Sequence, residues 1–356
     1  MKAMIMAAGV GSRLMPLTVE IPKPMIPMAN RPLMESIVNL LKEHQFNEVI
    51  ANLHYHASTI SDYFGSGEAF GLSLQYSLEE ELKGTAGGVK NCENFLNDTF
   101  VVVSGDALTD IDLTALMKAH RSNGALATIA LKKVDDVEQF GVVVHNDAGK
   151  IKKFQEKPKP EEALSNMANT GIYVFEPEIF KYIPARQFYD FGKQVFPHLV
   201  KNKAPFYGVP IEDYWCDVGN INTYRQAHQD VLAGRVRTKT ERIIIDGQND
   251  TKVLCGENTN IGQEVSFSGN VVIGSGCTIQ DGARFTDCII WNNSNIGAGS
   301  WLKECVVGSQ CNIGRQVKID AGAVVASRCQ LEDKVDIKAR QKVFVNTSGL
   351  LQLEQG

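Results

Sequence analysis

The stretch MIMAAGVGSRLMPLTVEIPKP, residues 4–24, decides how the N-terminal part of the chain folds. It overlaps a short apolar run, residues 3–7, which predicts a buried strand, and the run is followed by a turn with Gly9, Gly11 and Ser12. Glycines let backbone N–H groups approach an anion, and successive amides in such a turn form a concavity of positive potential. The stretch therefore predicts a strand followed by a loop that can grip a phosphate group.

Two basic side chains in the same stretch extend this prediction. Arg13 supplies a planar fork of donors, and Lys23 supplies a point charge between Pro22 and Pro24. A Gly-x-Gly pattern alone more often marks a simple turn, and the added basic residues are what favour a binding loop. We expect Arg13 and Lys23 to hold a triphosphate from two sides.

Strands and helices alternate along the residues that follow. The apolar spacing predicts helices at 32–41, 58–64, 86–95 and 221–232 and strands at 48–53, 72–76 and 99–103. Asn30 is a candidate N-cap of the first helix. This order predicts a Rossmann-like α/β domain, an open and mostly parallel sheet covered by helices on both faces. Ligands of such sheets bind beyond the carboxyl ends of the strands, where the glycine loop lies.

Composition narrows the function classes. The 356 residues predict two domains, and 36 Lys and Arg against 41 Asp and Glu give a net charge of −5 without a basic block, which argues against nucleic acid as a partner. No apolar run approaches the length of a membrane span and the N-terminus lacks signal-peptide regions, so we expect a cytoplasmic protein without a membrane partner. Eight scattered cysteines without a Cys-x-x-Cys pair argue against a zinc site and predict reduced core thiols.

Two further segments should meet at the same edge of the sheet. Gly84 and Thr85 open a predicted helix and could direct backbone amides at a base or a phosphate, although such a turn is often only a turn. Gly105 and Asp106 follow a predicted apolar strand. A carboxylate at a strand end can hold Mg²⁺ against phosphate oxygens, and the alternative is a turn former or a helix cap.

The C-terminal part repeats every six residues, with only two steps of five. Glycine follows the repeated apolar residue at 262, 274, 297 and 314, which is typical of a parallel β-helix of hexapeptide repeats. If three hexapeptides form one turn, as in the left-handed β-helix that this pattern resembles, fifteen repeat positions make about five coils. The repeat positions are Ile261, Phe267, Ile273, Ile279, Phe285, Ile290, Ile296, Leu302, Val307, Ile313, Ile319, Val325, Leu331, Ile337 and Val343. Acyltransferases with such repeats use a histidine, but no histidine follows His228, so we expect the domain to serve assembly into a homo-oligomer.

The glycine loop as a whole resembles the signature of the sugar-1-phosphate nucleotidyltransferases, with Ala8 where glycine is usual and Ser12 where threonine is usual. The C-terminal repeats resemble a left-handed β-helix. Strings at 79–87, 154–158, 169–173, 189–197 and 214–220 match the family in order, and those at 79–87, 191–197 and around Trp215 are closest to bacterial mannose-1-phosphate guanylyltransferases.

The resemblance implies a role for each matching residue. Arg13 and Lys23 would be catalytic, and Asp106 and Asp217 would share one Mg²⁺. The implied nucleotide-binding residues are Ala8, Gly9, Gly11, Ser12, Gly84 and Thr85. The implied sugar-phosphate-binding residues are Gly105, Glu156, Lys157, Asn169, Gly171 and Lys193.

The implied domains are a catalytic domain at 1–234, a linker at 235–255, the β-helix at 256–345 and a tail at 346–356, of which we expect residues 352–356 to be free. The implied reaction joins a nucleoside triphosphate to a sugar 1-phosphate and releases pyrophosphate, with GTP and mannose 1-phosphate as the expected pair. UDP-glucose or ADP-glucose synthesis is the alternative. A non-catalytic regulatory subunit that binds nucleotide-sugar is a further alternative, which the presence of Arg13, Lys23, Asp106 and Asp217 disfavours.

Overall fold

The structure is a computed structural model that describes residues 1–239, 243–246, 251–346 and 349–355. It contains two compact units, and these do not follow the order of the chain. The first consists of Met1–Val10 and Met34–Asp217, and the second of Gly11–Leu33 and Val218–Gly356. The second half of the glycine loop therefore belongs to the same unit as the C-terminal repeats. Of the predicted linker, residues 240–242 and 247–250 lie outside the described residues.

The first unit is built on a nine-stranded mixed sheet. Strands run in the order β10-β9-β11-β6-β1-β4-β5, and β8 pairs with both β11 and β12. The four strands β6, β1, β4 and β5 are parallel, as predicted, whereas β11 is antiparallel to β6 and β8. The strands are β1 (Lys2–Met6), β4 (Glu48–Leu53), β5 (Ser73–Leu78), β6 (Phe100–Ser104), β7 (Ala107–Thr109), β8 (Ala127–Lys133), β9 (Gly141–His145), β10 (Ile151–Glu156), β11 (Met167–Phe175), β12 (Phe206–Pro210) and β13 (Trp215–Asp217).

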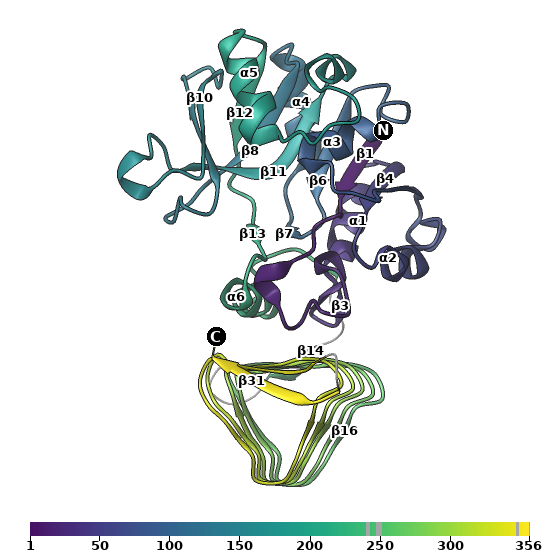
Figure 1. The fold of residues 1–356 in the computed structure, drawn as a ribbon, viewed down its shortest axis with the longest axis vertical. Coiled ribbons are helices and arrows are strands. Elements are labelled where there is room, and N and C mark those ends of the chain that lie inside the picture. Colours follow the sequence, from purple (N-terminus) through teal and green to yellow (C-terminus); the bar gives the residue numbers. More distant parts are fainter. Residues whose placement is uncertain (240–242, 247–250, 347–348, 356) are drawn as a thin grey trace. The chain divides into compact units, whose positions relative to one another are not determined.

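Helices cover both faces of this sheet, which confirms the predicted α/β class (Figure 1). Met4, Phe100 and Val102 pack with residues of α3, η6 and α5 on one face. On the other face, His120 of α4 bonds to Thr128 of β8, whose neighbours along the strand point to the first face. The helices are α1 (Leu33–Glu43), α2 (Ala57–Phe64), α3 (Gly84–Asn91), α4 (Leu113–Ser122), η6 (Phe191–Val195) and α5 (Phe196–Lys201), with short turns η3 (Glu68–Phe70), η4 (Pro160–Glu162) and η5 (Pro177–Tyr182).

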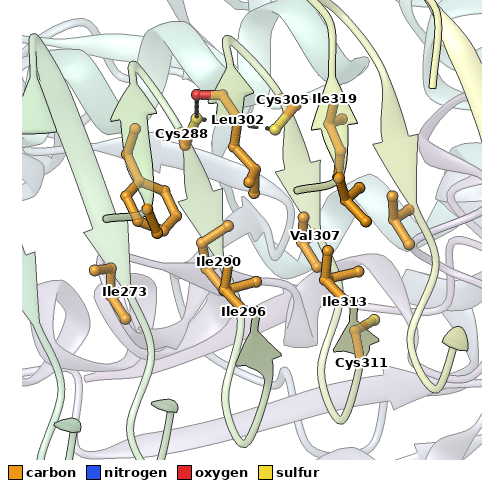
Figure 2. Packing of buried hydrophobic residues seen from close by; sticks show 14 of the residues in the cluster. Ile273, Cys288, Ile290, Ile296, Leu302, Cys305, Val307, Cys311, Ile313 and Ile319 are labelled. Carbon is orange, nitrogen blue, oxygen red and sulfur yellow. Dashed lines mark hydrogen bonds between the residues drawn. The ribbon is translucent and has the colours of Figure 1, made fainter. Parts of the chain in front are cut away.

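The C-terminal repeats of the second unit form a parallel β-helix, whose stacked three-sided coils are seen in Figure 1. All fifteen predicted repeat positions fall into three ladders of five. One ladder joins Ile273, Ile290, Val307, Val325 and Val343, and Figure 2 shows the first three of them on successive coils in the core. The second runs from Ile261 to Leu331 and the third from Phe267 to Ile337.

These ladders run through many short strands. They are β15 (Lys252–Cys255), β16 (Asn260–Ile261), β17 (Ser266–Ser268), β18 (Asn270–Ile273), β19 (Thr278–Ile279), β20 (Arg284–Thr286), β21 (Ile289–Ile290), β22 (Asn295–Ile296), β23 (Trp301–Lys303), β24 (Val306–Val307), β25 (Asn312–Ile313), β26 (Lys318–Ile319), β27 (Val324–Val325), β28 (Gln330–Leu331), β29 (Asp336–Ile337) and β30 (Gln341–Val345). The remaining elements of this unit are η1 (Ser12–Leu14), η2 (Lys23–Met25), β2 (Pro27–Met28), β3 (Arg31–Pro32), α6 (Ile221–Leu232), β14 (Ile243–Asp246) and β31 (Leu351–Gln355).

Small residues fill the corners between the ladders. The eight cysteines are free thiols, and all but the half-buried Cys216 are buried, as predicted for reduced core residues. Cys288 and Cys305 lie on successive coils with their sulfurs 3.8 Å apart, and the Cys288 thiol also donates to the Leu302 carbonyl (Figure 2). A thiol is compact enough for a corner, and burial inside the coil makes it behave as a small apolar group.

Two sequence predictions are wrong in this unit. Asn30 does not cap the first helix, because it lies in a left-handed turn between β2 and β3 and its side chain bonds to the Ile273 carbonyl instead. The tail is not free, because β31 pairs antiparallel with β30. The edge strand of a stacked sheet leaves a row of unpaired N–H and C=O groups, and the returning chain satisfies them.

The glycines that follow the repeat positions allow a test of the stacking. A Cβ added at Gly297 would lie 2.3 Å from the Gly314 carbonyl oxygen on the next coil. We expect Gly297→Ala to lower the free energy of unfolding by about 3 kcal/mol, the upper end of the usual cost of overpacking. Urea titration measures this value.

Gly299→Ala is the comparison, since its nearest added contact is 3.6 Å away at the Gln316 side chain. Its φ of 68° is left-handed, so alanine there should cost only about 1 kcal/mol of backbone strain. Equal costs for the two variants would contradict the close-stacking explanation.

Candidate active site

The carboxyl ends of the central parallel strands meet at one level. Met6, the last residue of β1, pairs with Asn52 of β4 on one side and Ser104 of β6 on the other. A pocket of about 260 Å³ opens beside these residues. It is lined by Met6, Ala8, Gly9, Asn52, Glu79, Leu82, Gly84, Thr85, Ser104, Asp106 and Phe188. Five predicted site residues, Ala8, Gly9, Gly84, Thr85 and Asp106, therefore line one pocket.

A buried polar hub forms one wall of this pocket. Asn52 accepts from the Ala7 amide at 2.9 Å and donates to Oε1 of Glu79 at 2.6 Å, and the Lys83 amide donates to Oε2 at 2.9 Å. Asn52 and Glu79 are 5% and 4% exposed. A Cβ on Gly88 would lie 2.6 Å from Oε1 of Glu79, so the glycine lets α3 pack directly on the hub. The hub fixes the start of the glycine loop to the segment before α3.

The start of α3 is joined to the residues before η6. The Thr85 hydroxyl donates to Oδ2 of Asp190 at 2.9 Å and accepts from the Phe191 amide at 2.9 Å. The amides of Ala86 and Gly87 donate to the Tyr189 carbonyl, so they are occupied within the protein. The predicted nucleotide segment and one predicted sugar-phosphate segment are thus in direct contact.

The two predicted metal ligands also come together. Strand β13 pairs antiparallel with β7, and this register sets Asp217 opposite Ala107, one residue from Asp106. Both carboxylates are half-buried, and Asp106 accepts from the Ser104 hydroxyl at 2.5 Å. Mg²⁺ prefers oxygen ligands and is often bound by one or two carboxylates together with substrate phosphates. The pair fits that ion. No cluster of three or more His, Cys, Asp or Glu suited to a metal occurs among the described residues.

Glu156 and Lys193 lie near each other although they are far apart in the sequence. A Cβ on Gly192 would lie 2.3 Å from Oε2 of Glu156, so glycine leaves space for this carboxylate beside η6. Desolvation and then repulsion by Asp190 raise the pKa of the Glu156 carboxyl, while Lys157 and Lys193 act in the opposite direction. Two carboxylates, Glu156 and Asp190, and two cations, Lys157 and Lys193, therefore lie close together at the end of β10 and the start of η6.

Asn169 and Gly171 form a bulge in β11. The Asn169 side chain accepts from the Gly171 amide at 3.0 Å and donates to the Tyr173 hydroxyl at 3.1 Å. Gly171 has a left-handed φ of 76°, and an added Cβ would lie 3.2 Å from Cβ of Ser104. The bulge therefore lies against the residue that bonds to Asp106. The indole of Trp215 donates to the Thr170 carbonyl at 3.0 Å and ties the strand of Asp217 to the same bulge.

Of the remaining predicted residues, Gly105 lies in the first unit, where its amide donates to the Met6 carbonyl at 2.9 Å. Gly11, Ser12, Arg13 and Lys23 belong to the second unit. Gly11 has a left-handed φ of 72° and precedes η1, and an added Cβ would lie 2.8 Å from Cβ of Lys23. The loop therefore closes on itself around Gly11. Lys23 is only 5% exposed, whereas Arg13 is exposed.

Sequence reasoning missed several residues of the site. Asn52, Glu79 and Phe188 line the pocket, and Asp190 holds Thr85 together with the amides of Gly192 and Lys193. A signal existed for Asn52, because it is the last residue but one of a buried strand at the carboxyl edge of the sheet. Nothing in the sequence marks the exposed Phe188.

Both parts of the chain match known families. Residues 2–234 match the family described as nucleotidyl transferase, and residues 249–347 match the GMPPB C-terminal domain. No helix among the described residues is long and apolar enough to cross a membrane.

Relatives extend along nearly the whole chain. A UTP–glucose-1-phosphate uridylyltransferase of Synechocystis is 40% identical over 91% of this chain and 92% of its own. A probable mannose-1-phosphate guanylyltransferase of Oryza sativa is 29% identical over 94% of this chain and 93% of its own. A solved structure described as a putative glucose-1-phosphate thymidylyltransferase of Bacillus anthracis, in complex with a sucrose, superposes with a TM-score of 0.60 at 27% identity, and covers 68% of this chain and 97% of its own.

The fold defines an α/β protein with a polar pocket at the carboxyl edge of its sheet. The chain belongs to the nucleotidyl transferase family. Its reaction class is nucleotidyl transfer to a sugar 1-phosphate.

The polar hub gives a stability prediction. Asn52→Leu removes both partners that the Asn52 amide supplies, and leaves the buried Ala7 N–H and Glu79 carboxylate each short of a hydrogen bond. At 1–3 kcal/mol for each orphaned group, we expect the free energy of unfolding to fall by about 3 kcal/mol. Urea titration followed by fluorescence checks this.

Asn97→Leu is the control, because Asn97 is exposed and its side chain accepts a hydrogen bond from the Lys2 ammonium at the surface. We expect it to cost less than about 0.5 kcal/mol. A cost below about 1 kcal/mol for Asn52→Leu would mean that the hub does not depend on the Asn52 amide.

Proposed function

We propose that the protein transfers a guanylyl group from GTP to mannose 1-phosphate and releases pyrophosphate. The observation that carries the choice of base is the buried Glu79 carboxylate in the pocket wall. A carboxylate only accepts hydrogen bonds. The Watson–Crick edge of guanine offers two adjacent N–H donors, whereas uracil offers one N–H between two carbonyl oxygens that a carboxylate repels. Glu79 therefore suits guanine better than uracil.

A second pairing has its own support. The Synechocystis relative, named for UTP and glucose 1-phosphate, is more similar to this chain than the Oryza relative named for mannose 1-phosphate. UTP with glucose 1-phosphate is accordingly the second candidate. The GMPPB C-terminal domain match favours the mannose branch.

This reaction depends on how the protein positions the substrates and neutralises their charge, and less on proton transfer. The attacking oxygen of a sugar 1-phosphate is already an anion, so displacement at the α-phosphorus needs no general base and no covalent enzyme intermediate. The site agrees with this chemistry, because none of the described residues that line the pocket is a histidine or a cysteine.

Each group of residues has a proposed part in this reaction. Ala8, Gly9, Gly84 and Thr85 would hold the nucleotide, and Glu156, Lys157, Asn169 and Lys193 would hold the sugar phosphate. Arg13 would bind the departing pyrophosphate and Lys23 the transferred phosphate. Asp106 and Asp217 would hold Mg²⁺, which, when bound, neutralises charge on the phosphate oxygens.

Pyrophosphate release tests the proposal. GTP, UTP, ATP and dTTP are crossed with mannose 1-phosphate and glucose 1-phosphate in the presence of Mg²⁺. We expect GTP with mannose 1-phosphate to give the highest kcat/KM. A dominant UTP and glucose 1-phosphate pair would establish the second candidate, and no release from any pair would favour a regulatory subunit.

Glu79→Gln tests the reason for the base preference in the same assay. We expect the ratio of kcat/KM for GTP over UTP to fall roughly tenfold, because one acceptor oxygen is replaced by a donor. Glu80→Gln, at the exposed neighbouring position, is the control and should keep the wild-type ratio. An unchanged ratio in Glu79→Gln would contradict a role for Glu79 in base choice.

A further inference from the structure

The loop that contains Lys23 continues into a small hairpin of unusual conformation. Strands β2 and β3 pair through a two-residue turn, and both turn residues are left-handed, with φ of 49° at Ala29 and 68° at Asn30. Two-residue hairpin turns of this kind favour Asn-Gly, because residues with a Cβ are strained there. The Ala-Asn turn therefore needs support from its surroundings.

Helix α6 supplies two of the supporting bonds. The Tyr224 hydroxyl donates to the Pro27 carbonyl at 2.5 Å, and the Ala29 amide donates to Nε2 of His228 at 3.2 Å. Nδ1 of His228 in turn donates to the Tyr224 carbonyl at 3.0 Å. Burial lowers the pKa of His228 to about 4, so its ring is neutral near pH 7 and Nε2 is free to accept from Ala29.

The β-helix supplies a third bond to the hairpin and also holds Tyr224. The Asn30 side chain donates to the Ile273 carbonyl at 2.9 Å, and the indole of Trp291 donates to the Tyr224 hydroxyl at 2.9 Å. Tyr224 is fully buried and Trp291 is 2% exposed. The Tyr224 hydroxyl thus connects a β-helix corner to the hairpin.

The hairpin is joined closely to Lys23. Lys23 begins η2, and the Ile26 amide donates to the Lys23 carbonyl at 3.2 Å. The Leu33 amide then donates to the Ile26 carbonyl at 3.0 Å and closes the base of the hairpin. Lys23 also packs against Gly11, because a Cβ added to this glycine would lie 2.8 Å from Cβ of Lys23. A displaced hairpin would therefore displace Lys23 and the turn at Gly11.

We propose that Tyr224, held by Trp291 of the β-helix, is a positioning residue for the phosphate-binding loop. The β-helix then serves the reaction, because its first coils fix the hairpin that places Lys23. The kinetic part of this inference rests on the proposed role of Lys23.

Hydrogen exchange tests the structural part without any substrate. In the full-length protein, Tyr224→Phe removes the hydroxyl and keeps the ring. Asn30→Gly removes only the bond to Ile273 and leaves a residue suited to the turn, so it serves if Tyr224→Phe folds poorly. We expect faster amide exchange within residues 11–33 in both variants and unchanged exchange in α1. Tyr76→Phe, which loses a hydroxyl bonded to the Gly65 carbonyl, is the matched control.

A double-mutant cycle tests the kinetic part with the sugar phosphate and nucleotide that the wild type uses best. We expect Tyr224→Phe to lower kcat/KM by roughly ten- to a hundredfold, the cost of a misplaced catalytic group. In a Lys23→Met background the same change should have almost no further effect, because Tyr224 acts through Lys23.

The outcomes separate this inference from the proposed function. Unchanged exchange within residues 11–33, or fully multiplicative effects of the two substitutions, overturns the positioning role. A wild type without turnover contradicts the proposed function, and the exchange measurement then decides by itself whether the β-helix holds the loop.

Discussion

The pairing of β7 with β13 is the constraint on which the proposed chemistry depends. These two short strands are far apart in the sequence, and their register alone sets Asp217 opposite Ala107, beside Asp106. The pairing is secured at one end, because the Thr109 hydroxyl donates to the Tyr214 carbonyl and the Trp215 indole donates to the Thr170 carbonyl. A slip of one residue would turn Asp217 to the other face of this two-stranded sheet and change its placement relative to Asp106.

Around this pair, the backbone of several glycines lies close to side chains from other segments of the chain. Gly88 lies against Glu79 and Gly192 against Glu156, where an added Cβ would come closer than 3.0 Å, and Gly171 lies against Ser104, where it would be a tight contact at 3.2 Å. The absence of side chains at these positions lets separate segments converge on one edge of the sheet. The polar groups brought together there are bonded to one another, so the pocket is shaped before any ligand binds. This preorganisation is what a reaction that relies on positioning needs.

The β-helix was predictable in detail, because its period is strict and each repeat position has only one inward-facing place in the coil. The central parallel strands and the glycine loop were also predictable, since apolar runs and turn glycines are local signals. The hairpin at Ala29 and Asn30 was not, because its left-handed turn is stabilised by Tyr224, His228 and Ile273, which are distant in the sequence. The same holds for Asp190 and for the pairing of β31, whose partners no local pattern reveals.

The most direct test of this account is the position of the metal ion in crystals grown with Mn²⁺ and a non-hydrolysable nucleoside triphosphate. The account predicts one anomalous peak within about 2.2 Å of an oxygen of Asp106 and an oxygen of Asp217, with phosphate oxygens completing its coordination. A metal ion bound elsewhere, or held by only one of the two carboxylates, would contradict it.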